Sequence, residues 1–278
     1  QQLSTRGAEL ELLDKQQTNQ RIGSSKFFGA LFNKSAGTIN PLSYCIGLAL
    51  AAQSKGANIY ETTLATKIQS INGHWLIKTT KGSIEAKMLL IATNAYQQPI
   101  KGIKSPEYTS VHYFQVATNP LPEKDTKMIL PNGEGCWDTA SVMSSFRLDE
   151  DNRLIIGGVG NLGHGASKIH TNWARRKIKS LFPNLKNIPI EYNWHGRIAM
   201  TANHIPKIQK LGNNAYSIFG FSGRGIGPGT YFGKAVVESL LSGDENSLPV
   251  TPMSQNKERY SGIKSKLFEL GATASHLL

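Results

Sequence analysis

The sequence predicts a mixed α/β (α+β) fold, in which helices, parallel strands and antiparallel sheets share one chain of 278 residues. Two observations predict it. Residues 88–92 form an unbroken apolar run, which is typical of a strand buried on both faces of a parallel sheet. From residue 113 onward the pattern is antiparallel instead, because two strand-like runs, residues 142–148 and 153–159, flank the turn "DEDN".

A helix is predicted from Pro41, because Asn40 can cap it, proline suits its first turn and Gly56 ends it. Residues 42–50 carry an apolar stripe at helical spacing. A strand at residues 57–63 is expected next. A three-stranded meander follows, with two-residue turns at the dipeptides Asn72-Gly73 and Lys81-Gly82.

The second half is expected to continue with a helix at residues 168–183 and a long strand at residues 187–200. A further strand, residues 215–221, leads into a glycine-rich loop and a final helix that ends near Gly243. The chain opens at Gln1 inside a polar, helix-like run, so we expect a fragment or a processed product.

Composition argues against several classes of protein. The formal net charge is +12, but the basic residues are scattered and the densest cluster, residues 175–179, lies in a predicted helix without a nucleic-acid motif. A solvated basic face is therefore expected, with no nucleic-acid partner. The two cysteines lack CxxC spacing and the seven histidines lack ligand spacing, so no metal is predicted. A reducing, cytoplasmic location and no transmembrane segment are expected.

One motif resembles a dinucleotide fingerprint. Residues 158–163, "GVGNLG", match G-x-G-x-x-G between a strand and a helix. The preceding strand belongs to a hairpin, however, and "HGAS" separates the last glycine from the helix. A strand end followed by a loop is the preferred interpretation, and the nicotinamide alternative rests on this motif alone. A serine-hydrolase elbow is not indicated, because Arg224 stands where its last glycine should be.

The most informative stretch is "GFSGRGIGPG", which contains Gly220, Gly223, Gly225, Gly227 and Gly229 and directly precedes a helix. A tight turn explains one or two glycines but not five. Glycines before a helix let backbone N–H groups and the positive end of the helix dipole approach an electron-rich group. A phosphate or the edge of a flavin ring would suit this loop.

Several blocks, in order and with matching spacing, resemble the FAD-dependent amine and amino-acid oxidoreductases of the D-amino acid oxidase-like superfamily. They include "GTINPLSYCIGLALAAQSKG", "LLIATNAY", "SSFRLDEDNRLIIGG", "WHGRIAM" and "GFSGRGIGPGTYFGKAVVESL". The resemblance is strongest to the gamma-glutamylputrescine oxidase branch and covers roughly residues 10–250.

The resemblance implies an incomplete Rossmann-like FAD domain and an antiparallel-sheet substrate domain. It assigns residues 37–99 and 194–250 to the FAD domain and residues 100–193 to the substrate domain, with a helical lead-in at residues 1–36 and a helical tail at residues 251–278. The family's dinucleotide-binding segment would precede residue 1. Its absence leads us to expect weak FAD binding by these 278 residues alone.

The resemblance also implies functional residues. Arg224 would stabilise the reduced flavin, and Tyr113, Asp138 and Arg147 are candidate substrate-side groups, with fold-stabilising hydrogen bonds as the alternative for each. The residues expected to bind the cofactor are Leu64, Ala92, Thr93, Asn94, Gly196, Gly223, Gly225, Ile226 and Gly227.

The implied reaction is hydride transfer from a small-molecule amine to FAD, giving an imine and then an aldehyde. Amino-acid oxidases of the family generally carry an arginine four residues after the tryptophan of "WHGRIAM", where this chain has Ile198. That departure favours a primary or secondary amine, gamma-glutamylputrescine-like, over a simple α-amino acid. A truncated, non-catalytic binding or structural subunit is the alternative.

Overall fold

A computed structural model describes residues 4–163 and 165–278. The chain divides into two compact units. The first unit comprises Gln1–Tyr44, His112–Gly196 and Phe268–Leu278, and the second comprises Cys45–Val111 and Arg197–Leu267. Each unit therefore contains segments that are far apart in the sequence. The functional division into FAD-domain and substrate-domain portions stays a prediction.

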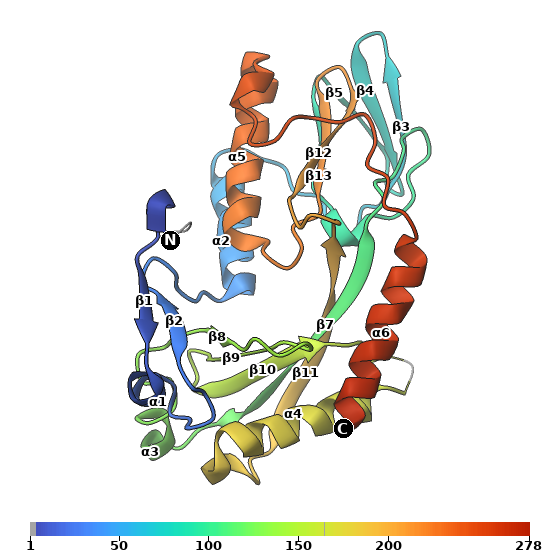
Figure 1. Ribbon diagram of the computed structural model, residues 1–278. Coiled ribbons are helices and arrows are strands. Elements are labelled where there is room, and N and C mark those ends of the chain that lie inside the picture. Colours follow the sequence, from blue (N-terminus) through green and yellow to red (C-terminus); the bar gives the residue numbers. More distant parts are fainter. Residues whose placement is uncertain (1–3, 164) are drawn as a thin grey trace. The chain divides into compact units, whose positions relative to one another are not determined.

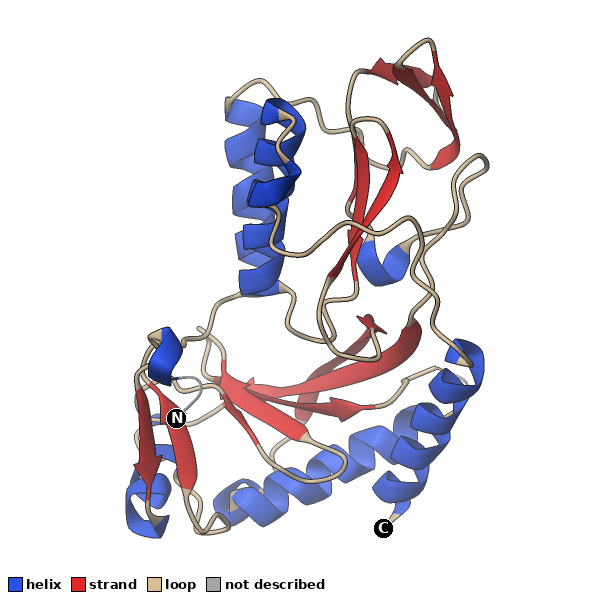
Figure 2. Ribbon diagram, turned by 45° about the horizontal axis from the view of Figure 1, so that its top comes forward, coloured by secondary structure: helices blue, strands red, loops and turns tan. Residues whose placement is uncertain are grey.

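The first unit contains a five-stranded antiparallel sheet, and helix α4 (Ser167–Leu181) lies against one of its faces (Figures 1 and 2). The spatial order is β11-β7-β10-β9-β8. The predicted hairpin around "DEDN" is confirmed, since β9 and β10 pair from Leu148 opposite Leu154 to Ser144 opposite Gly158. The strands are β7 (Thr109–Pro120), β8 (Cys136–Trp137), β9 (Ser144–Leu148), β10 (Arg153–Val159) and β11 (Ile190–Met200).

Alternation along these strands gives the sheet two different faces. One face packs on α4 and forms the core of the first unit, which includes Phe114, Val116, Phe146, Leu154, Ile156, Ala174, Ile178 and Leu181. Burial of each such large side chain contributes about 1.5–3 kcal/mol. Because successive side chains of a strand point to opposite faces, Gln115, Arg147 and Ile155 lie on the other face. That face carries the pocket described below.

Residues 1–36 were expected to form a helical lead-in, but of the described residues 4–36 only part is helical. It contains η1 (Ser4–Arg6), α1 (Lys15–Ile22) and a two-stranded antiparallel sheet of β1 (Leu10–Leu13) and β2 (Ala30–Asn33). Asp14 and Gln17 form a capping box at the start of α1. Gly23 ends the helix at φ +76°, and a Cβ there would lie 2.1 Å from the Met128 carbonyl oxygen, so no other residue fits. Short helices α3 (Glu123–Thr126) and η3 (Pro183–Leu185) complete the first unit.

The second unit contains two three-stranded sheets. The predicted meander is confirmed as β3 (Ala65–Ile71), β4 (His74–Thr79) and β5 (Ser83–Ala86). Both residues of its first turn have positive φ, +50° at Asn72 and +81° at Gly73, as a type I′ hairpin turn requires. In the other sheet, β6 (Leu89–Ile91) pairs in parallel with β13 (Ala215–Phe219), which pairs with β12 (Lys207–Gly212). The parallel strand expected at residues 88–92 is therefore present.

The prediction of a strand at residues 57–63 is wrong. This segment is irregular and ends in a turn with Thr62 at φ +52°. Its apolar side chains Ile59 and Tyr60 are exposed, so no strand of the described residues supplies the cross-strand packing on which a strand depends.

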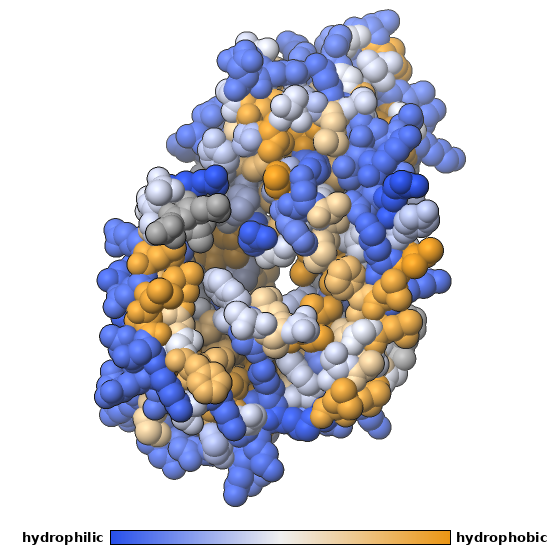
Figure 3. All heavy atoms as spheres, viewed as in Figure 1, coloured by the Kyte–Doolittle hydropathy of each residue, from blue (hydrophilic) through white to orange (hydrophobic). Residues whose placement is uncertain are grey.

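Helix α2 (Pro41–Ser54) begins where predicted, and Asn40 accepts a hydrogen bond from the backbone N–H of Ser43. Its apolar stripe is not buried: Leu42, Ile46 and Leu50 are between 49% and 69% exposed. Helix α6 (Ser261–Leu277) also exposes apolar side chains. Figure 3 shows exposed apolar side chains over α6 and, as a separate group, over β1 and β2. Helical periodicity here predicted the helix but not a packing partner. The remaining helices are η2 (Asn94–Tyr96), α5 (Ile226–Ser242) and η4 (Glu245–Ser247).

The dinucleotide-fingerprint alternative at residues 158–163 finds no support in the topology. Strand β10, which carries its first glycine, pairs antiparallel with both β7 and β9 and opens no βαβ unit. Gly160 has φ +152°, and a Cβ there would lie 2.7 Å from the His170 ring. This glycine is required by the packing of α4. His164 lies outside the described residues.

Candidate active site

The glycine-rich loop begins at the carboxyl ends of two parallel strands. β6 and β13 are hydrogen-bonded neighbours, so the segments that follow them, Ala92 to Asn94 and Gly220 to Gly225, start at the same edge of the sheet. The Asn94 side-chain oxygen accepts a hydrogen bond from the Gly220 N–H at 3.0 Å. Crevices outside the carboxyl ends of parallel strands are where α/β proteins bind ligands.

Two of the loop glycines are required by backbone geometry. Gly220 has φ +80°, and a Cβ there would lie 2.5 Å from the Thr201 methyl group. Gly223 has φ +85°. Between them Ser222, at φ +51°, donates its N–H to the Ala199 carbonyl and its hydroxyl to the Gly220 carbonyl. The chain thus holds the first half of the loop in one conformation.

The other glycines face open space. A Cβ added at Gly225, Gly227 or Gly229 would meet no atom of the described residues within 4 Å. Helix α5 starts here, with Gly225 at its N-cap and no side chain capping it, and Arg224 is exposed. Open space against bare backbone at a helix N-terminus, beside a cation, fits the electron-rich edge of a flavin.

The side chains of Ile198 and Arg197, which are neighbours on β11, have different contacts. The Cδ1 atom of Ile198 is the nearest neighbour of a Cβ built on Gly223, at 3.6 Å. The Arg197 guanidinium instead lies 4.8 Å from the centre of the Tyr96 ring, and the Tyr96 hydroxyl accepts a hydrogen bond from the Arg197 N–H. An apolar side chain is therefore what β11 presents to the loop at Gly223.

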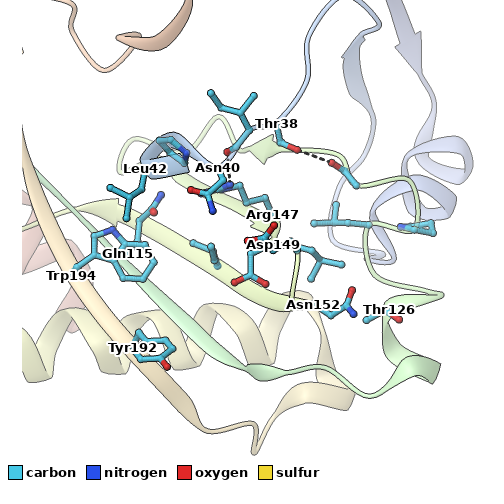
Figure 4. A pocket seen from close by; sticks show the side chains of 18 of the residues that line it. Thr38, Asn40, Leu42, Gln115, Thr126, Arg147, Asp149, Asn152, Tyr192 and Trp194 are labelled. Carbon is cyan, nitrogen blue, oxygen red and sulfur yellow. Dashed lines mark hydrogen bonds between the residues drawn. The ribbon is translucent and has the colours of Figure 1, made fainter. Parts of the chain in front are cut away.

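The first unit contains a pocket of about 1290 Å³ on the sheet face opposite α4 (Figure 4). Gln115 of β7, Arg147 of β9, Ile155 of β10, and Tyr192 and Trp194 of β11 line it, together with residues 38–42. Gly157 of β10 makes this arrangement possible, because a Cβ there would lie 2.7 Å from the Gln115 Cγ atom. The pocket is lined by aromatic, amide and charged groups at once.

Of the three predicted substrate-side residues, only Arg147 lines this pocket. The Tyr113 hydroxyl lies 2.7 Å from the Ser145 Oγ atom, and burial raises the pKa of Tyr113. Asp138 accepts hydrogen bonds from the Ser144 N–H and hydroxyl and from Lys177 of α4, the last at 2.7 Å. Burial by itself raises the pKa of Asp138, but the hydrogen bonds from Lys177 and Ser144 outweigh it and hold that pKa below its usual range. These contacts fit the structural alternative for Asp138.

The remaining predicted residues lie in several places. Leu64 precedes β3 and is half exposed. Its carbonyl accepts a hydrogen bond from the Thr80 N–H, and its own N–H donates to the Thr80 hydroxyl. Ala92 and Thr93 are exposed after β6, and Gly196 lies within β11. Gly223, Gly225, Ile226 and Gly227 belong to the loop and the first turn of α5. The structure thus brings Asn94 directly to the loop and leaves Leu64 in the meander.

Sequence reasoning missed Gln115, Tyr192 and Trp194. The signal available was period-two spacing: Gln115 follows Tyr113 by two positions, and Trp194 follows Tyr192 by two, each on a predicted strand. Which face of each strand would carry a pocket depends on the position of α4, which no local pattern encodes.

Comparison with known proteins identifies the family. Residues 1–239 match the FAD dependent oxidoreductase family. This chain is a member of that family. It is 31% identical over 241 residues to the gamma-glutamylputrescine oxidoreductase of Escherichia coli K12 and likewise 31% identical over 241 residues to the probable oxidoreductase OrdL of Haemophilus influenzae. Each alignment covers 85% of this chain and 55% of the relative, so this family member spans about half the length of those relatives.

Solved structures agree on the fold. The L-proline dehydrogenase from P. horikoshii matches with a TM-score of 0.76 at 23% identity, over 89% of this chain and 68% of that one. The glycine oxidase from Geobacillus kaustophilus matches with a TM-score of 0.71 at 18% identity, over 87% of this chain and 65% of that one. The mixed α/β fold is thereby confirmed, and the cofactor of the family is FAD. Among the helices that the structure describes, none has the length and apolar character needed to cross a membrane.

Proposed function

We propose that this family member takes part in FAD-dependent oxidation of a primary or secondary amine, with gamma-glutamylated diamines foremost. The observation that supports it most is the glycine loop, which starts at the carboxyl ends of β6 and β13 and leaves open space over Gly225, Gly227 and Gly229. The relative whose name states an amine substrate, gamma-glutamylputrescine oxidoreductase, is 31% identical.

FAD would supply the chemistry, accepting a hydride from the carbon next to the substrate nitrogen and leaving an imine that water hydrolyses to an aldehyde. The residues of this chain would hold the edge of the flavin ring. Backbone N–H groups at the start of α5, the positive end of that helix and the Arg224 guanidinium would stabilise the negative charge that gathers there. Asn94 would fix the loop through its bond to the Gly220 N–H.

Ile198 supports an amine over a simple α-amino acid. A buried carboxylate costs several kcal/mol unless it is paired. Ile198 offers no hydrogen-bond donor to the loop at Gly223, and Arg197 is engaged with Tyr96. At this position the chain therefore lacks the group that would clamp a carboxylate attached to the reacting carbon. A cytoplasmic location, suggested by the two free cysteines, belongs to the same proposal.

Anaerobic titration tests the proposal. The full gene product is purified and loaded with FAD, and gamma-glutamylputrescine is added while the flavin absorbance near 450 nm is followed. Loss of the flavin absorbance after each addition of the amine supports an amine oxidoreductase. Stoichiometric FAD that no amine bleaches would instead favour the non-catalytic role.

A further inference from the structure

Helix α6 carries exposed apolar side chains (Figure 3), and they follow the spacing of a coiled coil. Five exposed positions alternate in steps of four and three residues: Ile263, Leu267, Leu270, Ala274 and Leu277. The four larger side chains are between 59% and 67% exposed. Because all five positions lie on one helix, helical geometry alone places them in a single stripe. Steps of four and three are the spacing of the a and d positions through which paired helices pack.

The opposite side of α6 is already occupied. The Ser265 hydroxyl accepts a hydrogen bond from the Ser110 N–H at 3.0 Å, and the Glu269 carboxylate accepts one from the Asn161 N–H at 3.1 Å. His276, on the same side, is fully buried. These contacts already hold α6 as a helix. A second helix could therefore bind the stripe without first ordering α6, which removes a large cost of association.

Charge is distributed unevenly along this part of the chain. Residues 257–266 carry four basic side chains and one acidic one, namely Lys257, Arg259, Lys264 and Lys266 against Glu258. Residues 267–278 carry no lysine or arginine. The carboxyl-terminal end of a helix is the negative end of its dipole. An antiparallel pair of α6 helices would place each basic end beside the negative end of the other helix, whereas a parallel pair would bring two basic ends together.

We propose that two copies of this chain associate through α6, with the two helices antiparallel. A twofold axis lets the same stripe serve both copies. In this arrangement Leu267 packs on Leu270 of the second copy, and Ile263 packs on Ala274 of the second copy, so that a positions meet d positions. The inference does not depend on the proposed function, since α6 contains none of the residues assigned to the flavin or the substrate. A contact of about two heptads is small for a protein interface, so the dimer should be reversible at micromolar concentrations.

Sedimentation velocity of the full gene product between about 1 and 200 µM measures the association. The wild-type protein should change from monomer toward dimer over this range. Leu270→Glu should raise the Kd at least about 10-fold, because it places an unpaired charge within the apolar contact. Leu12→Glu is the matched control, since Leu12 is 82% exposed on β1, outside α6, and it should leave the Kd unchanged.

Disulfide cross-linking in a glutathione buffer tests the orientation. A mixture of Ile263→Cys and Ala274→Cys should form a cross-linked dimer. Ile263→Cys alone should not, because the two copies of residue 263 would be about eleven residues, or roughly 16 Å, apart along the pair. Both variants also carry Cys45→Ser, since Cys45 is exposed. Cys136 is kept, because burial raises its pKa to about 12 and leaves little reactive thiolate.

Three results would overturn the inference. The first is a monomer at about 200 µM, and the second is a dimer whose Kd is the same in Leu270→Glu as in the wild-type protein. The third is monomer that binds vesicles of phosphatidylcholine and phosphatidylserine through the stripe, with binding lost in Leu270→Glu, which would assign α6 to a membrane surface. Efficient cross-linking of Ile263→Cys to itself would reject the antiparallel orientation. If circular dichroism shows that Leu270→Glu does not fold, Leu267→Glu and the cross-linking pair decide.

Discussion

Asn94 combines two features that few other residues could supply. Its backbone adopts φ +45°, and its side-chain oxygen accepts the Gly220 N–H at the start of the glycine loop. Asparagine tolerates left-handed backbone better than other non-glycine residues, because its short polar side chain can hydrogen-bond locally. One residue thus connects the end of β6 to the loop after β13.

Substitutions of Asn94 should separate these features. Asn94→Asp keeps an acceptor and is expected to be mild, whereas Asn94→Ala leaves the Gly220 N–H without its partner and should cost about 1–3 kcal/mol of unfolding free energy. Urea unfolding followed by circular dichroism measures both. Equal stability of the alanine variant and the wild-type protein would show that the contact does not hold the loop.

Substitution of Arg224 tests the role of the glycine loop itself. Its side chain is exposed, so Arg224→Ala should leave the fold intact. Loss of about 1.5–3 kcal/mol of charge-assisted stabilisation should slow reduction of bound flavin by roughly 10- to 100-fold. Anaerobic stopped-flow absorbance measures the rate. Reduction at the wild-type rate would mean that Arg224 does not contact the reduced ring.

At the scale of elements, two buried histidines join α6 to α4. The Nδ1 atoms of His170 and His276 lie 2.7 Å apart, and both Nε2 atoms are buried without a partner among the described residues. Trp173 stacks on His276 and Phe114 on His170. The charged groups nearby are Glu269 of α6 and Arg176 of α4, which donates to the His276 carbonyl.

This pair predicts acid sensitivity. Burial, with the adjacent His170 and Arg176, lowers the pKa of His276 from 6.5 to about 4. Burial also lowers the pKa of His170, although Glu269 opposes it. Because the unfolded chain binds protons more readily than the folded one, the stability that the neutral pair contributes is complete above about pH 6.5 and is lost as pH falls toward 4.

Hydrogen exchange measured at several pH values checks this. Intrinsic exchange rates are corrected for pH, and protection of the C-terminal part of α6 should decrease between pH 6.5 and 4, earlier than protection of β7. His276→Phe removes the titrating ring while keeping an aromatic side chain against Trp173, and should flatten the dependence. A variant with the wild-type pH profile would contradict the assignment to this pair.

At the scale of the whole molecule, the proposed function predicts a ranking of substrates. With FAD bound, gamma-glutamylated diamines should exceed glycine and other simple amino acids in kcat/KM by about 100-fold or more, because an unpaired buried carboxylate costs several kcal/mol. Peroxide release and flavin bleaching across both classes measure it. A simple D-amino acid as the best substrate would refute the interpretation of Ile198.

The formal charge of +12 affects this ranking little. It can raise the rate at which anionic substrates encounter the protein. Any advantage in kcat/KM that this gives them should fall as salt is added.

The sequence by itself determined the local features. Asn40 with Pro41 set the start of α2, Asn72-Gly73 set the hairpin turn, and five glycines marked the loop that precedes helix α5, because each depends on backbone conformations that a few neighbouring residues impose. The order of such blocks along the chain also indicated the family before any comparison.

Tertiary structure decided what each local feature faces. Asp138 was a reasonable substrate-side candidate until α4 brought Lys177 to it. Arg147 differs, because its guanidinium donates to the Ile39 carbonyl and forms no ion pair with the acidic residues that the structure describes. Tyr192 and Trp194 became pocket residues only when β11 joined the sheet beside β7. The reason is that strand order and face are set by packing between segments far apart in the sequence, which periodicity along a single strand cannot encode.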